Sequence, residues 1–282
     1  MPTELEALIA AVGTGARYRA ISPMLVEAVA RAELPKRRSQ KEAVKAVRSK
    51  LHQVVGVFLD STFDASLALG DLRACTGDGA ALRRCCRTLM EGHTSTRERL
   101  PLLETFYARI FRHLGAIHSV LDLGCGLNPL AIPWMPLAAG CAYHAYDVHG
   151  ELVNFLTDAL PLLGAAGGAH LADLTHDVID QPADLALLLK CLPSLEQLDR
   201  AAGARLLRSL QVKHMVVSFP VRSLGGRQKG MLAGYEAHFQ QLISDQPWQV
   251  ERLELPTELV FVITTDALAG SAALFLPPQQ VW

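Results

Sequence analysis

Residues 120–129 read Val120-Leu121-Asp122-Leu123-Gly124-Cys125-Gly126-Leu127-Asn128-Pro129. This stretch decides the fold, because an apolar run typical of a buried strand leads directly into a turn with two glycines. Glycine lets the backbone adopt conformations that a side chain forbids and lets it approach a ligand closely. Asp147 ends the next apolar run, about 20 residues on, where a carboxylate can accept hydrogen bonds from both hydroxyls of a ribose. Together, the glycine turn and Asp147 predict a site for an adenosine-containing cofactor.

The third position of the glycine pattern separates two classes of cofactor. A dinucleotide-binding turn needs G-x-G-x-x-G, so that the start of a helix meets the pyrophosphate, and this chain has Pro129 in place of the third glycine. D-x-G-x-G, with Asp122 in the strand and an acidic residue ending the next strand, is typical of S-adenosylmethionine (SAM) sites. We therefore predict SAM as the cofactor. A Rossmann-like domain for another ligand, and a tight turn that binds nothing, remain alternatives.

The sequence after residue 118 alternates short apolar runs with amphipathic segments, which is typical of a parallel sheet with helices around it. We predict strands at residues 119–123, 142–148, 169–173, 183–190 and 214–219, and a small Gly/Ala-rich loop at residues 164–169. Residues 249–255 and 259–265, joined by a turn at Pro256, are expected to pair antiparallel. The predicted fold class is α/β, a Rossmann-like SAM-dependent methyltransferase sheet with a C-terminal antiparallel hairpin, preceded by an N-terminal all-helical domain.

Residues 1–100 show helical patterns without the alternation of strands. From Ser39 onward one helix is expected to carry an apolar stripe, made of Val44, Val47, Leu51, Val54 and Phe58. Ser95 and Glu98 resemble a capping box that opens a helix over residues 96–113 and joins two domains. We predict a helical domain at residues 1–100 and a methyltransferase domain at residues 101–282.

The net charge of −1 hides an uneven distribution. Residues 31–50 contain Glu33 and Glu42 against eight basic residues, namely Arg31, Lys36, Arg37, Arg38, Lys41, Lys45, Arg48 and Lys50. A second basic run, Arg222, Arg227 and Lys229, is interleaved with glycines. Local charge governs the capture of polyanions, so these runs indicate an anionic partner larger than a metabolite. The alternative is an ordinary solvated helix face.

Composition excludes several other classes of protein. The apolar runs are far shorter than the roughly 20 residues of a membrane span, and the N-terminal sequence has no features of a secretory signal. The six cysteines form no CxxC pair and have no partnering histidine cluster, which argues against a zinc site and a disulfide framework. We expect a cytoplasmic protein with reduced cysteines, no metal and no membrane partner.

Three further stretches go beyond a generic methyltransferase: residues 93–99 (HTSTRER), 187–197 (LLLKCLPSLEQ) and 218–227 (SFPVRSLGGR). With residues 123–129 (LGCGLNP), they resemble the aminoglycoside-resistance 16S rRNA (guanine(1405)-N(7))-methyltransferases. The similarity runs in matching order from about residue 93 to residue 265. Before residue 93, only the helical, basic character agrees.

The resemblance implies a set of cofactor contacts. His93, Thr94, Ser95 and Arg99 would line the methionine end of SAM, and the Arg99 guanidinium could grip a carboxylate through two parallel hydrogen bonds. On the residues alone, a surface pair at a helix start is an alternative for Arg97 and Arg99, and Asp173 could equally be a helix N-cap. Gln197 belongs to the same motif, but Leu198 stands where the family often has a second glutamine. The remaining implied contacts are Gly124, Gly126, Asp147, Asp173, Leu174 and Leu189.

The resemblance also implies the target, N7 of a guanine in 16S rRNA within the 30S subunit, and resistance to aminoglycosides. Guanine N7 carries a lone pair and needs no deprotonation, so we expect catalysis by positioning rather than by an acid or base. The loop after the fourth strand lacks the Pro-Cys of cytosine C5 enzymes and the Asn/Asp-Pro-Pro-aromatic loop of adenine N6 enzymes, so Cys191 is expected to pack. Target positioning is assigned to Lys190, Arg222 and Ser223, and rRNA binding to Lys36, Arg37, Arg38, Lys41, Lys45, Arg48 and Arg227.

We expect a monomer that binds no DNA. Two other functions remain open at this stage. One is a SAM-dependent methyltransferase that acts on another RNA or on a small molecule. The other is a catalytically silent ribosome-binding factor.

Overall fold

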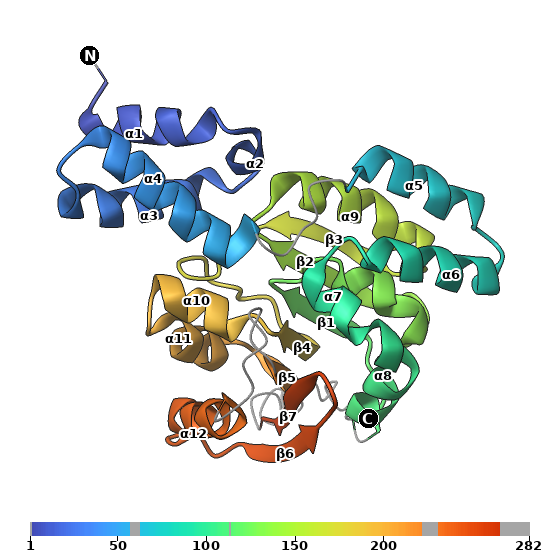
Figure 1. The fold of residues 1–282 in the computed structure, drawn as a ribbon. Coiled ribbons are helices and arrows are strands. Elements are labelled where there is room, and N and C mark those ends of the chain that lie inside the picture. The colour runs from blue at the N-terminus through green and yellow to red at the C-terminus, as the bar shows by residue number, and fades with distance from the viewer. Residues whose placement is uncertain (1, 57–62, 113, 222–230, 266–282) are drawn as a thin grey trace, which may run out of the picture.

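The computed structural model describes residues 2–56, 63–112, 114–221 and 231–265. Its centre is a seven-stranded sheet in the order β3-β2-β1-β4-β5-β7-β6 (Figure 1). The first five strands in this order pair in parallel, whereas β7 is antiparallel to both β5 and β6. The strands are β1 (Ser119–Leu123), β2 (Ala142–Asp147), β3 (Ala166–Leu171), β4 (Ala183–Leu189), β5 (Val212–Pro220), β6 (Gln249–Glu254) and β7 (Glu258–Thr264). The predicted α/β sheet with its C-terminal antiparallel hairpin is confirmed.

The third strand is displaced from its prediction. β3 begins at Ala166, so Gly167 and Gly168 pair with Tyr143 and His144 of β2 rather than forming a loop. Gly167 has a φ of +103°, and a Cβ there would lie 2.3 Å from the Tyr143 carbonyl oxygen. The glycines of this edge strand therefore allow close backbone pairing. The prediction assigned them to a loop because of their Gly/Ala-rich composition.

Helices cover both faces of the sheet. Alternate residues of β1 point to opposite faces and therefore contact different helices. Val120 packs with α8 (Leu103–Phe111) and α9 (Gly150–Leu162), and Leu121 packs with α11 (Ala202–Ser209) and α12 (Met231–Ile243). A 3₁₀ helix, η4 (Asn128–Trp134), follows the glycine turn and contains Pro129 and Pro133. α10 (Leu192–Leu198) follows β4.

The N-terminal part is helical, as predicted. Its elements are α1 (Glu4–Gly13), α2 (Ala16–Arg19), α3 (Pro23–Glu33), η1 (Leu34–Lys36), α4 (Gln40–Leu51), η2 (His52–Gly56), α5 (Ala65–Ala74), α6 (Gly79–Met90), α7 (Thr94–Arg99) and η3 (Leu100–Leu102). Ser39 caps α4 by accepting from the Glu42 N–H. Val47, Leu51 and Val54 are buried and Val44 is half-buried, while Phe58 lies outside the described residues.

The apolar cores divide the chain at a different place from residue 100. α1, α3 and α4 share a core of their own, from Leu8 to Leu51, and form a separate lobe in Figure 1. α5 and α6 instead contribute Leu72 and Met90 to the core of the sheet, next to α9. We call residues 2–56 the helical unit.

The predicted capping box at Ser95 and Glu98 is wrong. His93 is the N-cap of α7, Ser95 lies in the first turn, and Glu98 pairs with Lys190 instead of the helix start. Thr96 donates its hydroxyl to the carbonyls of Met90 and His93. The expected helix over residues 96–113 is also interrupted, because Pro101 stands in η3 between α7 and α8.

Candidate active site

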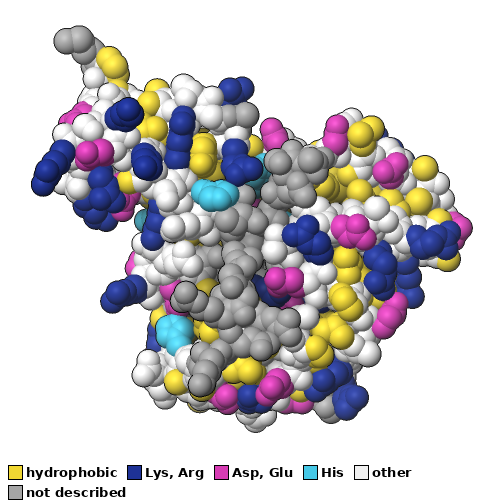
Figure 2. All heavy atoms as spheres, in the orientation of Figure 1, with side chains coloured by type: hydrophobic (Ala, Val, Ile, Leu, Met, Phe, Trp, Pro, Cys, Tyr) yellow, Lys and Arg dark blue, Asp and Glu magenta, His cyan; other side chains and the backbone are white. Residues whose placement is uncertain are grey.

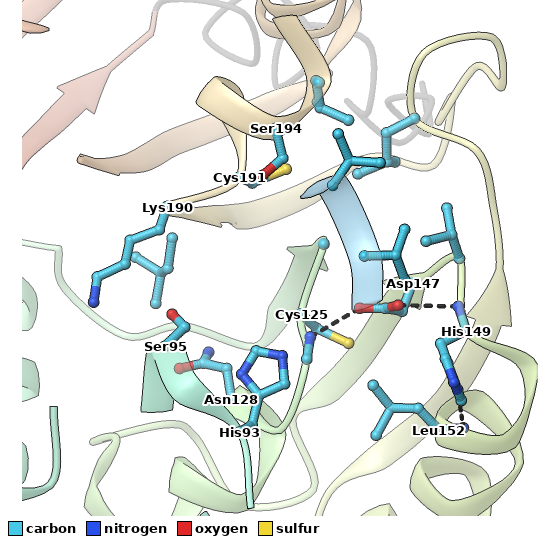
Figure 3. Close-up of a pocket in the computed structure, with 18 of the residues that line it drawn as sticks. His93, Ser95, Cys125, Asn128, Asp147, His149, Leu152, Lys190, Cys191 and Ser194 are labelled. Atoms are coloured by element: carbon cyan, nitrogen blue, oxygen red, sulfur yellow. Dashed lines mark hydrogen bonds between the residues drawn. The ribbon is translucent and has the colours of Figure 1, made fainter. Parts of the chain in front are cut away.

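A cavity lies at the carboxyl ends of β1, β2 and β4, where open α/β sheets bind their ligands. Figure 3 shows His93 and Ser95 on one side and Asp147 and His149 on the other. The structure brings together eight of the predicted site residues around this cavity, namely His93, Ser95, Gly124, Gly126, Asp147, Leu174, Leu189 and Lys190. Further lining residues are Val54, Val55, Cys125, Asn128, Val148, His149, Leu152, Ala172, Cys191, Ser194 and Leu195.

The glycine turn requires its two glycines. Gly124 and Gly126 have φ angles of +66° and +52°, in the left-handed region that disfavours side chains. A Cβ on Gly124 would lie 2.8 Å from the Cys191 Sγ, and a Cβ on Gly126 would lie 2.6 Å from the His93 ring. Cys191 is buried, and burial raises the pKa of its thiol. It packs against the turn, as expected of a residue that is not a nucleophile.

Asp147 fixes the turn from the end of β2. Its Oδ2 accepts from the Gly126 N–H at 2.9 Å and its Oδ1 accepts from the His149 N–H at 3.0 Å (Figure 3). Burial raises the pKa of this carboxyl, and the two backbone hydrogen bonds oppose that shift. A carboxylate thus stands at the cavity, where it could receive ribose hydroxyls.

His93 covers the turn from α7. Its side chain is buried, and burial, followed by the charges of Arg99 and Lys190, lowers its pKa to about 3. The ring is therefore neutral near pH 7, and it adds no positive charge beside a cationic ligand.

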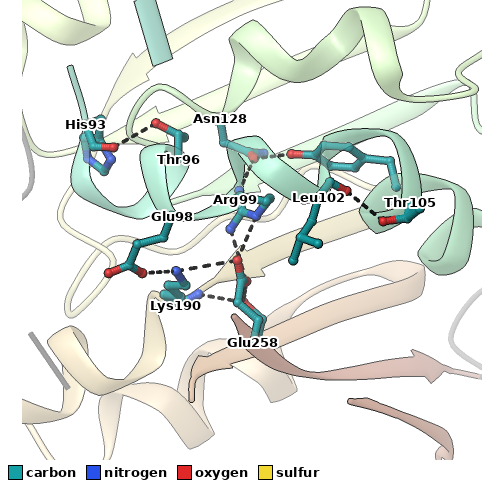
Figure 4. A network of polar contacts seen from close by, with 11 residues as sticks. His93, Thr96, Glu98, Arg99, Leu102, Thr105, Asn128, Lys190 and Glu258 are labelled. Carbon is teal, nitrogen blue, oxygen red and sulfur yellow. Dashed lines mark hydrogen bonds and ion pairs between the residues drawn. The ribbon is translucent and has the colours of Figure 1, made fainter. Parts of the chain in front are cut away.

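Arg99 has a different role from the expected contact with the methionine carboxylate. Its side chain is 0% exposed, and it does not line the cavity. Nε and Nη2 donate to the two carboxylate oxygens of Glu258 at 2.8 and 3.1 Å, and Nη1 donates to the Asn128 Oδ1 at 2.8 Å (Figure 4). The fork that was expected to bind a ligand carboxylate binds a carboxylate of β7 instead.

Lys190 belongs to the same group of charges, which we call the ion cluster: Arg99, Glu258, Lys190 and Glu98. The Lys190 Nζ lies 2.6 Å from Glu98 and 3.6 Å from Glu258. Its φ of +59° is rare for a residue other than glycine and is typical of functional sites. Its backbone N–H donates to the Ser218 carbonyl at 3.0 Å, which holds the end of β4 to β5.

Other predicted site residues lie elsewhere. Asp173 and Gln197 line a neighbouring groove between α3 and α10 rather than the cavity. The Asp173 carboxylate accepts from the Thr175 N–H and hydroxyl and so stabilises a turn; no helix begins in this described stretch, so Asp173 is not the helix N-cap considered above. Thr94 begins α7 but does not line the cavity. Arg222, Ser223 and Arg227 lie outside the described residues.

Figure 2 shows Lys and Arg side chains gathered over the helical unit. Lys36, Arg37, Arg38, Lys41 and Lys45 are all exposed, and Lys36 and Arg37 also pair with Glu33. Arg48 donates to the carbonyls of Ala11 and Val12 and lies over the Tyr18 ring. Its guanidinium therefore joins α4 to α1 rather than facing a partner, contrary to the prediction for Arg48.

Sequence reasoning missed Glu258 and the two valines of η2. Glu258 is fully buried and lies 159 positions from Arg99, so no local pattern points to the pair. Val54 was assigned to an apolar stripe, and only the fold turns it towards the cavity. Asn128 and Ser194, by contrast, stand inside motifs that were already quoted.

Comparison with known proteins gives a family. A family model described as "Ribosomal RNA methyltransferase (FmrO)" matches residues 14–262. The chain belongs to this family of ribosomal RNA methyltransferases. It is 39% identical over 257 residues to a 16S rRNA (guanine(1405)-N(7))-methyltransferase of Micromonospora echinospora, covering 90% of this chain and 94% of that protein. A relative of the same name from Serratia marcescens is 33% identical over 253 residues, and the match covers 88% of this chain and 93% of that protein.

Solved structures agree with this membership of the FmrO family. The crystal structure of 16S rRNA methyltransferase RmtF in complex with S-adenosyl-L-homocysteine superposes with a TM-score of 0.81 at 34% identity, covering 94% of this chain and 99% of that chain. The 16S rRNA methylase RmtB gives a TM-score of 0.77 at 28% identity, covering 94% and 100%. The predicted family and fold class are confirmed. Among the described residues, no helix combines the length and apolarity that crossing a membrane requires.

Proposed function

We propose that this enzyme transfers a methyl group from SAM to N7 of a guanine in the decoding region of 16S rRNA within the 30S subunit, and thereby gives resistance to aminoglycosides. The observation that carries the proposal is the cavity in which His93, the glycine turn and Asp147 meet. Relatives named 16S rRNA (guanine(1405)-N(7))-methyltransferase match nine-tenths of the chain.

The residues around the cavity fit SAM. The glycine turn leaves a cradle that Cβ atoms would fill, and the buried Asp147 carboxylate is suited to the ribose. Leu174, Leu189 and Leu195 offer apolar surface for the adenine ring. When bound, SAM supplies an electrophilic methyl group on a sulfonium.

The chain contributes position and electrostatics rather than an acid or base. The neutral His93 ring does not repel the sulfonium. Lys190 stands at the end of β4 with its ammonium held by Glu98 and Glu258, so its charge is fixed at the cavity wall. There it can orient a guanine turned out of its helix.

The helical unit would dock on rRNA by shape and phosphate position. We also propose that the enzyme acts as a monomer. A ribosomal substrate implies action in the cytoplasm.

The proposal is tested by incubating isolated 30S subunits with methyl-labelled SAM and mapping the 16S rRNA by mass spectrometry. One methyl at N7 of a decoding-region guanine is expected, together with gentamicin resistance in cells that express the enzyme. Label on another RNA or a small molecule would favour the first alternative. SAM binding that is absent by calorimetry would favour the silent ribosome-binding factor.

Charge reversal tests the docking surface separately. Changing Lys36, Arg37 and Arg38 together to Glu should weaken 30S binding by about tenfold or more and reduce its salt dependence, because fewer counterions are released. The affinity for SAM should stay unchanged in the absence of 30S subunits. Equal losses of both affinities would contradict this division of labour.

A further inference from the structure

Residues 20–22, which we call the anchor segment, connect α2 to α3 and lie against the chain directly after β2. The Ser22 N–H donates to the Val148 carbonyl at 2.7 Å, and the Gly150 N–H donates to the Ala20 carbonyl at 2.6 Å. Between these bonds, Ile21 and His149 form an antiparallel bridge. The anchor segment belongs to the helical unit, and its partners begin one residue after Asp147.

The helical unit also builds part of the cavity. Val54 and Val55 of η2 line it, and Val148 packs against the core shared by α1, α3 and α4. Beyond the anchor segment, a groove lies between the helical unit and the sheet domain. Leu25 and Val29 line one side of it, and Asp173 and Gln197 line the other. The anchor segment and η2 therefore connect the helical unit to the cavity.

A short path of hydrogen bonds joins the anchor segment to Asp147. The Val148 carbonyl accepts from Ser22, and the next N–H along the chain, that of His149, donates to the Asp147 Oδ1 at 3.0 Å. The His149 side chain caps α9 by accepting from the Leu152 N–H. Displacing the anchor segment would therefore displace the carboxylate that holds the glycine turn.

We propose that the anchor segment is a positioning element that holds Asp147 in its cofactor-binding geometry and so couples rRNA docking to cofactor binding. This inference rests on the proposed function, which places rRNA on the helical unit and SAM in the cavity. In this proposal, rRNA bound to the helical unit favours the arrangement in which the anchor segment is hydrogen-bonded to Val148 and Gly150. The cofactor favours the same arrangement, because it binds Asp147 in the position that these bonds hold. By linkage, 30S subunits raise the affinity for the cofactor by the same factor as the cofactor raises the affinity for 30S subunits.

Ser22→Pro is the sharpest test, because it removes one backbone N–H. Ser22 has a φ of −43°, close to the angle that proline imposes, and Ile21 before it lies in an extended bridge. Ser22→Ala is the matched control, since it keeps the N–H and the Ser22 side chain makes no capping hydrogen bond. Both full-length variants are titrated with S-adenosylhomocysteine, which cannot react, with and without saturating 30S subunits.

In Ser22→Pro, we expect the affinity for S-adenosylhomocysteine to fall about fivefold relative to Ser22→Ala, the factor typical of one net hydrogen bond. The tightening caused by 30S subunits should be lost, while 30S binding without cofactor changes less than about twofold. Gly150→Pro removes the second bond at the first position of α9, where proline is common, and it decides the matter if Ser22→Pro does not fold. Its control is Gly150→Ala, which keeps the N–H and brings the same Cβ within 3.3 Å of the Ala20 carbonyl oxygen.

Two negative outcomes differ in meaning. If the wild-type enzyme binds S-adenosylhomocysteine and methylates 30S subunits, but the proline variants bind and couple like Ser22→Ala, the inference is overturned alone. If the wild-type enzyme does neither, the proposed function fails and the inference fails with it.

Discussion

The cavity and the ion cluster lie side by side, and they use polar groups in opposite ways. Around the cavity, the Asp147 carboxylate and the glycine turn stand beside open space. In the ion cluster, Arg99 and Glu258 are 0% exposed and satisfy each other. A resemblance identifies residues at matching positions in the sequence. Only the hydrogen-bond and ion-pair partners of those residues show which ones face a ligand and which ones stabilise the structure beside the cavity.

The largest effect is expected from breaking the ion cluster. Glu258→Ala would leave the Arg99 charge buried without its partner, which typically costs about 3–5 kcal/mol of unfolding free energy. Glu98→Gln is the control and should cost less than Glu258→Ala, because Glu98 is 41% exposed and Lys190 keeps Glu258 as a partner at 3.6 Å. Urea unfolding measures both. A stable Glu258→Ala variant that has lost only methylation would assign Glu258 to catalysis and blur the contrast between the two regions.

Breaking the cavity should affect binding more than stability. Gly126→Ala places a Cβ against the His93 ring at a φ of +52°, and we expect the affinity for SAM to fall about tenfold or more, with about 1–3 kcal/mol lost in stability. Gly140→Ala is matched in backbone strain, with a φ of +66°, but meets nothing within 4 Å. Calorimetry on both variants separates the ring contact from the strain. Equal SAM affinities would argue against a cofactor at the turn.

The two regions were not equally predictable from the sequence. The glycine turn, Asp147 and most of the strand positions along the chain follow from local patterns, because each apolar run and each turn residue acts on its own neighbours. The pairing of Arg99 with Glu258 could not be predicted, since the partners lie 159 positions apart and meet only because β7 lies beside β5 in the sheet. Arg48 was misassigned for a similar reason, because its acceptors lie on α1.

Asp147→Asn should weaken SAM binding by about tenfold to a hundredfold, the range for a lost hydrogen bond to a charged group. The unfolding free energy should fall by about 1–3 kcal/mol, because asparagine can accept from only one of the two backbone N–H groups and leaves the other without an acceptor. Asp158→Asn, on the exposed face of α9, controls for the change in charge. A variant that loses stability but keeps its affinity would place Asp147 with the ion cluster instead.

The smallest effect is a change in pH dependence. Burial raises the pKa of Asp122 from 3.8 to about 6. The folded protein therefore holds a proton there that the unfolded chain has released, and this contribution to stability is present below the unfolded pKa and lost as the pH rises through about 6. Asp122→Asn, which does not titrate, should gain stability relative to the wild-type enzyme between about pH 5 and about pH 7.5. Parallel unfolding curves at both pH values would contradict the raised pKa.

The most direct test of the contrast is a crystal structure of the enzyme with S-adenosylhomocysteine. We predict the ligand between the glycine turn, Asp147 and Leu174, beneath His93, with the Arg99 guanidinium still paired with Glu258. A ligand carboxylate bound by Arg99, with Glu258 displaced, would contradict the assignment of the ion cluster to the wall. A ligand outside the cavity would contradict the assignment of the site itself.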